Sequence, residues 1–406
     1  MLSYHSSRGR VDVRTAKSTA EIHTTVEALL ALWEHRLPAS RDARVVIKPN
    51  LNNDLVALTG NSVDLRVLDA LIGGLQRRGY RNLTVADGSN VGIERRHIDS
   101  LRRLRVRALC ERCGVAVVDL NRDTGRRVNL EGGAKPLVAR TILDCDYLIS
   151  VPKIKTHAEA GLSCAMKNWV GITVGQDKRQ MHYDLGRNIF VLNRVVRPDL
   201  ILMDGVIGME GNGPGDGDPV GLGLLLMSDD AILNDRVVCR LVDMPVEQVP
   251  YLIHAREAGL LEGEEELERQ LPVLHHLRPA PPRSRLAVLS EARQLLWLKK
   301  ATRPIVAQPK VTEAAYKLKI IQDVYSLEDD SLRLVGRDAS GCGDCHRCAE
   351  ACPTQVPLAD IGVVFQDCVQ CLYCWWVCPK DALKLEGEQG HLLRQVQRYK
   401  GAIEAL

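Results

Sequence analysis

The stretch that decides the C-terminal fold reads C-G-D-C-H-R-C-A-E-A-C-P at residues 342–353, and its pattern recurs as C-V-Q-C-L-Y-C-W-W-V-C-P at residues 368–379. Each run places three cysteines at two-residue intervals and adds a fourth cysteine, followed by proline, after three further residues. Three cysteines on one tight loop direct their thiolates to the irons of a single 4Fe-4S cube. The sequence therefore predicts two 4Fe-4S clusters.

The two runs resemble the bacterial two-cluster ferredoxins over roughly Gly336 to Lys384. This resemblance implies a small α+β ferredoxin-like domain that transfers single electrons at low potential. It also implies that the fourth cysteine of each run ligates the cluster of the other run. The expected ligand sets are Cys342, Cys345, Cys348 and Cys378 for one cluster, and Cys368, Cys371, Cys374 and Cys352 for the other.

Zinc binding and disulfides are the alternative interpretations of these cysteines. Zinc is satisfied by paired C-x-x-C units and does not require a third cysteine at the same interval followed by Cys-Pro. Disulfides are disfavoured in a reducing compartment. The segment Met1–Arg8 contains neither an apolar signal region nor a twin-arginine pair, and no apolar run reaches the roughly 18 residues of a membrane span. The sequence therefore predicts a cytoplasmic protein without a membrane span.

The size of the chain indicates more than one domain. Its 406 residues are 45% hydrophobic, which is enough for a large core. The net charge is +3, from 54 Lys and Arg against 51 Asp and Glu, and gives no support for a nucleic-acid partner. We expect an α/β domain over residues 1–260, a helical connector over 261–335, the two-cluster domain over 336–385 and a C-terminal helix over 386–406.

Strand and helix patterns alternate from Arg44 onward. Buried strands are predicted over Arg44–Asn50, Leu83–Ala86 and Val115–Val118, and helices over Val63–Arg78 and near Ser100–Arg112. This alternation predicts an α/β fold with a mostly parallel, Rossmann-like sheet and helices on both faces. Ligands of such sheets bind at the carboxyl ends of the strands.

The predicted strand Tyr147–Pro152 leads directly into a group of cationic residues. Lys153, Lys155 and His157 follow it, and Lys167-Asn168 comes ten residues later. Lysines that converge at a strand end make a positive site for phosphate or carboxylate. Burial lowers the pKa of a lysine and so suits it to acid-base chemistry. The alternative is a set of exposed lysines whose aliphatic stems pack on the sheet.

Further candidates for the same site lie downstream. The strand Leu200–Asp204 leads into a glycine-rich loop, Gly208–Pro219, which is neither a dinucleotide fingerprint nor a P-loop. Glycines allow the backbone to approach an anion closely, although a plain flexible connection is the alternative. The candidate substrate-binding residues are Lys153, Lys155, Asn168, Asp204, Glu210, Asn212, Gly213 and Asp235, and the candidate catalytic residues are His157, Lys167 and His182.

Two other segments bear on the organisation of the chain. The basic run Arg102–Arg107 is interpreted as a solvated helix face or as a surface for an anionic partner. Beyond Pro245 the pattern weakens, with helices expected over Glu257–Gln270 and Leu286–Lys299. The tail His391–Leu406 is expected to form one helix that packs back on the body of the protein.

The segments Val151–His157, Lys167–Gly171 and Asp204–Pro214 together resemble the domain of unknown function 362 family, and Ile47–Asn50 also matches. The resemblance extends over roughly residues 45–260. Many members carry a C-terminal two-cluster ferredoxin domain. The family is distantly similar in fold to the nickel-pincer-nucleotide lactate racemases, but this sequence has no histidine-rich metal-site pattern of that kind. The resemblance therefore implies an architecture and the position of a site more than a reaction.

These features predict an iron-sulfur oxidoreductase. Electrons would pass through two 4Fe-4S clusters to an anionic small molecule at the Lys/His/Asn site, and His157, His182 or Lys167 would supply a proton. An electron donor or acceptor protein is expected as a partner. One alternative is an electron-transfer subunit that docks to another protein. A second is a non-redox lyase or isomerase with structural or sensing clusters.

Overall fold

The computed structural model describes residues 2–261, 263–281, 325–342, 345–357 and 367–406. A ten-stranded sheet forms the centre of the α/β domain, in the order β1-β2-β12-β11-β8-β3-β4-β5, with β9 and β10 joined to it through β11. The strands are β1 (Leu2–Ser6), β2 (Gly9–Thr15), β3 (Val45–Pro49), β4 (Leu83–Asp87), β5 (Ala116–Asp119), β8 (Tyr147–Val151), β9 (Lys153–His157), β10 (Gly161–Ser163), β11 (Leu200–Glu210) and β12 (Asp218–Ser228). A separate small sheet pairs β6 (Gly125–Arg127) with β7 (Leu137–Ala139).

The central part of the large sheet is parallel, as predicted. Strands β11, β8, β3, β4 and β5 pair in parallel. The edge made by β1, β2 and β12 is antiparallel, and the sequence analysis did not predict it. Strand β12 contains a continuous apolar run, Leu224–Met227, without the polar alternation that marks a half-exposed strand. Its pairing with β2 depends on contacts between segments far apart in the sequence.

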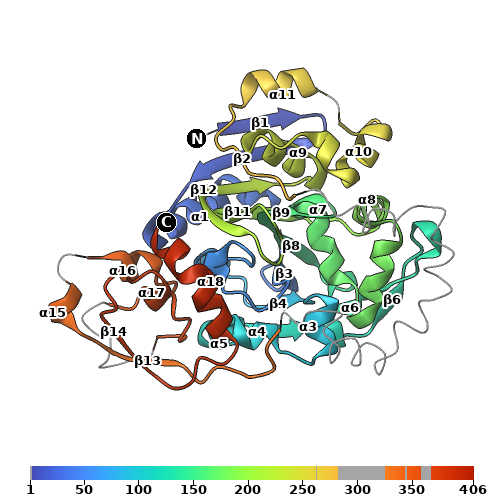
Figure 1. Cartoon of the computed structure of the whole chain (residues 1–406). Helices are drawn as coiled ribbons and strands as arrows, with labels where there is room; N and C mark the ends of the chain where they lie inside the picture. Colours follow the sequence, from blue (N-terminus) through green and yellow to red (C-terminus); the bar gives the residue numbers. More distant parts are fainter. Residues whose placement is uncertain (1, 262, 282–324, 343–344, 358–366) are drawn as a thin grey trace.

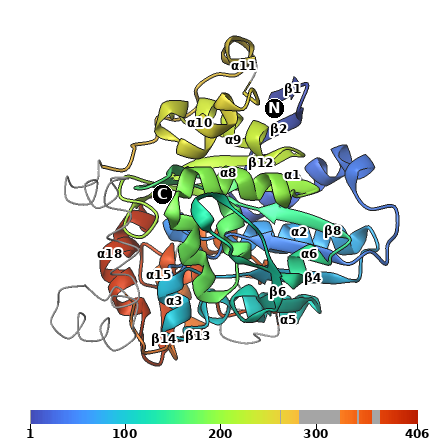
Figure 2. The same ribbon diagram turned by 90° about the vertical axis from the view of Figure 1, so that its right-hand side faces the viewer.

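Helices cover both faces of the sheet, as predicted (Figures 1 and 2). Alternate strand residues point to opposite faces, so Val45 and Ile47 belong to one core and Val46 to the other. The first face is covered by α1 (Thr19–Leu32), α2 (Leu65–Arg77), α4 (Ser100–Arg103) and α5 (Val106–Cys113). The second is covered by α6 (Arg140–Leu143), α7 (Ala165–Asn168), α8 (Leu185–Val195), α9 (Ala231–Leu241) and α10 (Pro250–Glu257). The short helix α3 (Val91–Arg95) follows β4.

Local sequence explains where these helices begin and end. Ser18 and Glu21 form a capping box at the start of α1, and the Asp64 side chain caps α2. Gly79, with φ of +89°, follows the end of α2 as predicted. The single helix predicted near Ser100–Arg112 is instead divided into α4 and α5, because Arg105 adopts a left-handed φ of 61° between them.

Two predicted boundaries near the lysines were wrong. The strand β8 ends at Val151, and Lys153 starts a new strand, β9, since Pro152 has no N–H to continue a ladder. Strand β9 pairs with β10 and β11. Strand β11 runs on to Glu210, so the first residues of the predicted glycine-rich loop belong to the strand. The connection to β12 is therefore limited to residues 211–217.

The C-terminal part is built from small elements that share a core with the α/β domain. They are β13 (Arg333–Arg337), α15 (Ala339–Cys342), α16 (Arg347–Ala351), α17 (Tyr373–Trp376), β14 (Leu383–Glu386) and α18 (Leu392–Glu404). Buried Trp376 and Leu392 belong to the same hydrophobic core as Leu29 and Leu68 of α1 and α2. Figure 1 shows this part, in orange and red, packed beside the α/β domain.

The predicted tail helix is present as α18, and it packs on the α/β domain. Its Gln395 side chain accepts from the Val56 N–H (2.9 Å) and donates to the Asp54 carbonyl (2.9 Å). Its Arg398 pairs with Asp218 at 2.6 Å. The helix that follows the cysteines therefore returns to the large sheet.

The predicted connector is only partly described. The helix expected over Glu257–Gln270 is instead two helices, because α10 ends at Glu257 and α11 covers Glu264–Gln270. The helix expected over Leu286–Lys299 lies outside the described residues. Within the described ranges, no helix has the length and apolar character needed to cross a membrane.

The basic run Arg102–Arg107 forms an interface within the chain. Arg103 is buried and bonds to Asp54 (2.6 Å) and Asp329 (2.9 Å), and Arg105 pairs with Asp330. These arginines fix the segment that leads into the C-terminal part. Neither interpretation from the sequence included this role.

Candidate functional site

Cationic side chains gather where the parallel strands of the large sheet end. Lys48 is the penultimate residue of β3, Lys153 and Lys155 lie on β9, and Lys167 lies on α7, next to Asn168. Lys48, Lys153, Lys155 and Asn168 are buried, and Lys167 is partly exposed. We call these five residues, with Asp87, Asp204 and the buried Lys178, the lysine site.

Lys48 has a complete set of partners. Its Nζ lies 2.6 Å from Asp87 Oδ1 and donates to Asn168 Oδ1 (2.7 Å) and to the Pro49 carbonyl (2.9 Å). An ammonium group has three donors, so all of them are used. Burial lowers the pKa of Lys48, and the Asp87 carboxylate opposes this shift. Lys48 is therefore part of the frame of the site.

Lys153 is held by a second buried carboxylate. Its Nζ lies 2.8 Å from Asp204 Oδ2. The same oxygen accepts from the Asp64 N–H (2.7 Å), and Asp204 Oδ1 accepts from the Val206 N–H (3.0 Å). Both ionic side chains are fully buried. Asp204 therefore positions Lys153, and its predicted role in substrate binding stays a prediction.

Lys155 is bound only by neutral oxygens. Its Nζ donates to Asn50 Oδ1 (2.9 Å) and to the Asn61 carbonyl (2.5 Å). No carboxylate within the described parts of the chain lies within 4.0 Å of it. Burial, followed by the nearby ammonium groups of Lys167 and Lys153, holds the pKa of Lys155 well below its ordinary value. Lys155 is thus a buried lysine of the site whose charge no adjacent carboxylate of the described residues neutralises.

Two further lysines lack a carboxylate partner. Among the residues that the structure describes, Lys167 Nζ has neither a hydrogen bond nor an ion pair, and burial lowers the pKa of Lys167 to about 8 although Glu159 opposes the shift. Buried Lys178 donates to Asn121 Oδ1 and the Thr173 carbonyl, and burial also lowers its pKa to about 8. Ammonium groups therefore outnumber the carboxylates that neutralise them in this region.

The two predicted catalytic histidines have other partners. His157 Nδ1 accepts from the backbone N–H groups of Glu159 (3.0 Å) and Ala160 (3.1 Å), and so shapes the turn between β9 and β10. His182 is exposed, and its Nδ1 lies 3.0 Å from a Glu159 carboxylate oxygen. Since Glu159 also acts electrostatically on Lys167, the His182–Glu159 pair borders the site.

Asp235 lies beneath the site rather than facing it. Its two oxygens accept from the backbone N–H groups of Ala165 (2.8 Å) and Met166 (3.0 Å), at the start of α7. Burial raises the pKa of Asp235 to about 7. Asp235 thus fixes the helix that carries Lys167 and Asn168, and its predicted contact with a substrate stays a prediction.

The hairpin between β11 and β12 contributes little to the site. Glu210 binds the Arg278 backbone N–H (3.0 Å), and Asn212 is exposed at the tip. Gly213 packs against β9, where an added Cβ would lie 2.3 Å from the Thr156 carbonyl oxygen. Of the three predicted hairpin residues, only Gly213 is thus pressed against a strand that carries the lysines.

Several residues that build the site were not among those predicted from the sequence. Lys48 is the penultimate residue of β3 and Asp87 is the last residue of the neighbouring parallel strand β4, and that position at the shared sheet edge was the available signal. Lys178 and Asn61 belong to no motif. Gly171 lies so close that an added Cβ would meet Lys48 Nζ at 2.7 Å and Asp87 Oδ1 at 2.6 Å. A small residue is required there.

The cysteines of the second predicted ligand set share one cavity. Cys352, Cys368, Cys371 and Cys374 line it, together with Cys348. Burial, and then the neighbouring Cys352 and Cys368 groups, raise the pKa of Cys374 above its ordinary value. The fourth cysteine of one run thus lies beside the three of the other run. This arrangement fits a shared 4Fe-4S cube.

The same region does not offer a compact site for one ion. Within the described ranges, no three His, Cys, Asp or Glu side chains are close enough to hold a single metal ion. A zinc ion draws its sulfur ligands to about 2.3 Å from one point, whereas a cube carries each thiolate on a different iron. The shared cysteine cavity, and the absence of a single-ion site among the described residues, are therefore both compatible with a cluster.

The first predicted set is less completely described. Lys380 Nζ donates to the Cys342 carbonyl at 3.1 Å, which brings the start of the first run close to the end of the second, near Cys378. Residues 343–344, within the first run, lie outside the described part of the chain. The assignment of Cys342, Cys345, Cys348 and Cys378 to one cluster stays a prediction.

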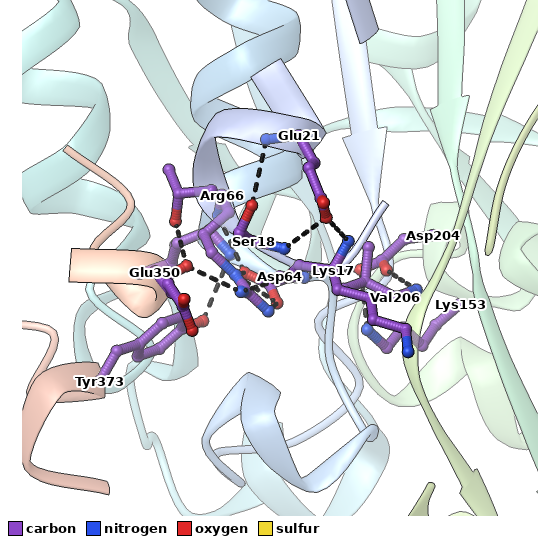
Figure 3. A network of polar contacts seen from close by, with 12 residues as sticks. Lys17, Ser18, Glu21, Asp64, Arg66, Lys153, Asp204, Val206, Glu350 and Tyr373 are labelled. Carbon is purple, nitrogen blue, oxygen red and sulfur yellow. Dashed lines mark hydrogen bonds and ion pairs between the residues drawn. The ribbon is translucent and has the colours of Figure 1, made fainter. Parts of the chain in front are cut away.

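Polar contacts connect the cysteine runs with the lysine site (Figure 3). The Tyr373 hydroxyl accepts from the Leu65 N–H (3.2 Å), and the Arg66 guanidinium donates to the Glu350 carbonyl (3.3 Å). The adjacent Asp64 N–H donates to Asp204, the partner of Lys153. The two regions are therefore joined through the first turn of α2.

Comparisons with known proteins agree with the resemblance seen in the sequence. Residues 45–240 match the family model described as a domain of unknown function (DUF362). Thylakoid-associated protein sll1697 from Synechocystis sp. is 29% identical over 130 residues, which are 30% of this chain and 40% of that protein. The chain therefore spans less than half of that relative. The family match ends before the two cysteine runs, so the ferredoxin-like domain stays a prediction.

Two solved structures have a weak likeness to the fold. The lactate racemase apoprotein from Thermoanaerobacterium thermosaccharolyticum is 13% identical, with a TM-score of 0.38 over 57% of each chain. A protein from Thermotoga maritima is also 13% identical, with a TM-score of 0.30 over 63% of this chain and 59% of that one.

Proposed function

We propose that this protein is an iron-sulfur oxidoreductase that acts on a small anionic molecule held at the lysine site. The observation that carries the proposal is the excess of positive charge there. Lys155, Lys167 and Lys178 have no carboxylate partner among the described residues. An unpaired buried charge costs several kcal/mol, so such a site either releases protons or takes up an anion. Carboxylate and phosphate groups both suit it.

The lysines differ in the role that their contacts permit. Lys48 is saturated by its partners and keeps the frame rigid. Lys155 makes two hydrogen bonds to protein oxygens, which leaves one of its three donors for a ligand. Lys167 is partly exposed and its pKa is about 8, so it exchanges a proton near neutral pH. We assign anion binding to Lys155 and proton transfer to Lys167, with His182 and Glu159 at the rim.

The cysteine cavity supplies the redox part of the proposal. The cysteines Cys352, Cys368, Cys371 and Cys374 would hold one cube, and Cys342, Cys345, Cys348 and Cys378 the other. When bound, such clusters supply electrons one at a time at low potential. The bonds from Tyr373 and Glu350 to the first turn of α2 support a common function of both regions.

The site assignment is tested with the double variant Lys155→Ala/Lys167→Ala. Native mass spectrometry of protein purified without oxygen should show two clusters and an additional bound anion, and the variant should lose only the anion. Lys135→Ala, which changes an exposed lysine, serves as the control. An anion retained by the double variant would place the ligand elsewhere. A mass that contains zinc in place of the cubes would overturn the redox part.

A non-redox lyase or isomerase is the second candidate. It is favoured by the pKa of Lys155, held well below the ordinary value, because a neutral amine acts as a base without any electron transfer. Turnover that persists after both clusters are oxidised would support this candidate. Turnover that requires a reductant would support the oxidoreductase.

A further inference from the structure

One buried ion pair lies at the junction between the cysteine runs and the α/β domain. Arg66 Nη2 lies 2.7 Å from Asp64 Oδ2, and Arg66 Nε donates to both Asp64 oxygens at 3.1 Å. Asp64 is fully buried and Arg66 is 5% exposed. A two-point contact of this kind fixes the orientation of the guanidinium. The pair therefore presents the remaining Arg66 donors in one direction.

That direction is toward the first cysteine run. Arg66 Nη1 donates to the Lys17 carbonyl (2.9 Å) and to the Glu350 carbonyl (3.3 Å). The Thr19 hydroxyl, at the start of α1, donates to the same Glu350 oxygen (2.7 Å). Glu350 lies between Cys348 and Cys352. The backbone between two predicted ligands is thus held by α1 and α2.

The second cysteine run reaches the same turn of α2. The Tyr373 hydroxyl accepts from the Leu65 N–H at 3.2 Å, and Tyr373 lies between Cys371 and Cys374. The first N–H groups of a helix have no acceptor within the helix. The Leu65 N–H therefore depends on a hydroxyl from the other region, while the Asp64 side chain caps the Arg66 N–H (2.9 Å).

From this turn the contacts continue to the lysines. The Asp64 N–H donates to Asp204 Oδ2 (2.7 Å), the oxygen that lies 2.8 Å from Lys153 Nζ. A shift of the first turn of α2 would alter the hydrogen bond from the Asp64 N–H to Asp204 Oδ2, and with it the interaction of that oxygen with Lys153. Lys153 in turn acts on the pKa of Lys155. Figure 3 shows Asp64, Asp204 and Lys153 as part of one connected group.

We propose that Arg66 and Tyr373 are positioning residues that make the geometry of the lysine site depend on the arrangement of the cysteine runs. Each contacts the first turn of α2 from the side of the predicted clusters, and Asp64 passes the constraint to Asp204. The functional role of this coupling rests on the proposed function: the lysine site would be assembled only when the electron-carrying region is in place.

The test is amide hydrogen exchange in the full-length, cluster-containing protein purified without oxygen. Tyr373→Phe removes only the hydroxyl and leaves the cysteines intact. The Leu65 N–H should exchange about fivefold faster, which is the effect expected for the loss of one hydrogen bond. The Val206 N–H, which bonds to Asp204 Oδ1, should exchange about twofold faster because Asp204 becomes less constrained.

Tyr147→Phe is the matched control, since it removes a buried hydroxyl that bonds to the Arg36 carbonyl (2.7 Å) at the opposite end of β8. Arg66→Lys is a second variant that keeps the charge beside Asp64 but loses the two-point contact. It should also accelerate exchange at Leu65 and Val206. Unchanged Val206 exchange in both variants, or equal acceleration in Tyr147→Phe, would overturn the coupling. Neither result depends on a substrate, so the proposed function would stand or fall separately.

Discussion

The lysine site is short of negative charge, whereas the cysteine region is short of positive charge. The lysine site contains ammonium groups, those of Lys155, Lys167 and Lys178, that no described carboxylate neutralises. In the cysteine region, burial and neighbouring thiol groups raise the pKa of Cys371 and of Cys374, so thiolates are unfavourable there without a cation. The comparison supports the proposal above, in which an anion would complete the lysine site and iron would complete the cysteine region.

The two regions also differ in how they are supported. The lysine site is held by strands β3 and β9 and by hydrogen bonds such as those that saturate Lys48. The cysteines lie in turns beside α16 and α17, of five and four residues. A metal site of this kind gains much of its order from the metal itself. The lysine frame should therefore persist without a ligand, and the cysteine region should depend on its clusters.

The largest effect should come from breaking the cysteine region. Cys352→Ala removes the predicted crossover ligand, and the iron content should fall from roughly eight to roughly four atoms per chain or fewer. Iron analysis and the visible absorption of the purified protein measure this loss. Cys110→Ala, which changes a buried thiol of α5, should retain all of the iron. Equal iron in the two variants would remove Cys352 from the ligand set.

The next effect separates paired from unpaired lysines. Lys48→Met leaves the Asp87 carboxylate buried without its cation, and should lower the free energy of unfolding by about 3–5 kcal/mol. Lys155→Met removes a cation without a carboxylate partner, so the change should stay within about 1 kcal/mol as lost hydrogen bonds offset the relieved desolvation. Urea denaturation measures both. Similar losses would contradict the assignment of Lys155 as the unpaired cation.

A smaller effect should appear as a pH dependence of stability. The pKa of Lys167 is about 8 in the folded protein, against about 10.4 for lysine in an unfolded chain. The unfolded state therefore binds more protons between these values, and the Lys167 contribution to stability rises with pH in that window. Relative to Lys167→Met, the wild type should gain roughly 1–2 kcal/mol between pH 8 and pH 10. A constant difference would mean that the Lys167 pKa is unperturbed by folding.

The smallest effect should come from the surface of the basic run. Arg107 and Asp99 form a partly exposed pair at 2.8 Å, and Arg107→Ala should cost about 0.5 kcal/mol or less. Arg103→Met, which leaves buried Asp54 without its partner, should cost about 3 kcal/mol. Denaturation curves give both losses in the free energy of unfolding, and their ratio compares the buried pair with the partly exposed pair. Equal losses would contradict the contacts described for Arg103.

Much of the fold follows from local patterns in the sequence. Strands β3, β4 and β8 and helix α2 were recognised from apolar periodicity. The gathering of Lys153, Lys155, Lys167 and Asn168 was predicted because carboxyl ends of parallel strands share one edge. The antiparallel edge of β1, β2 and β12 was missed, since its pairing joins distant segments.

The roles of single side chains were harder to predict. Asp235 was expected to face substrate, but its helix α9 packs so that the carboxylate meets the backbone of α7. Lys48 and Asp87 pair across neighbouring strands, and a sequence alone does not report which way such side chains point. The charge balance of the site became apparent only when each ion pair was known.

The return of α18 to the large sheet has a consequence for recombination among related genes. A segment that contained the cysteine runs and ended at β14 could be exchanged between related proteins only if few contacts crossed its boundaries. Here Gln395 and Arg398, beyond β14, hold the backbone at Asp54 and Val56 and the side chain of Asp218. A productive crossover would thus have to bring α18 together with its acceptors, so the two halves are expected to be inherited as one unit.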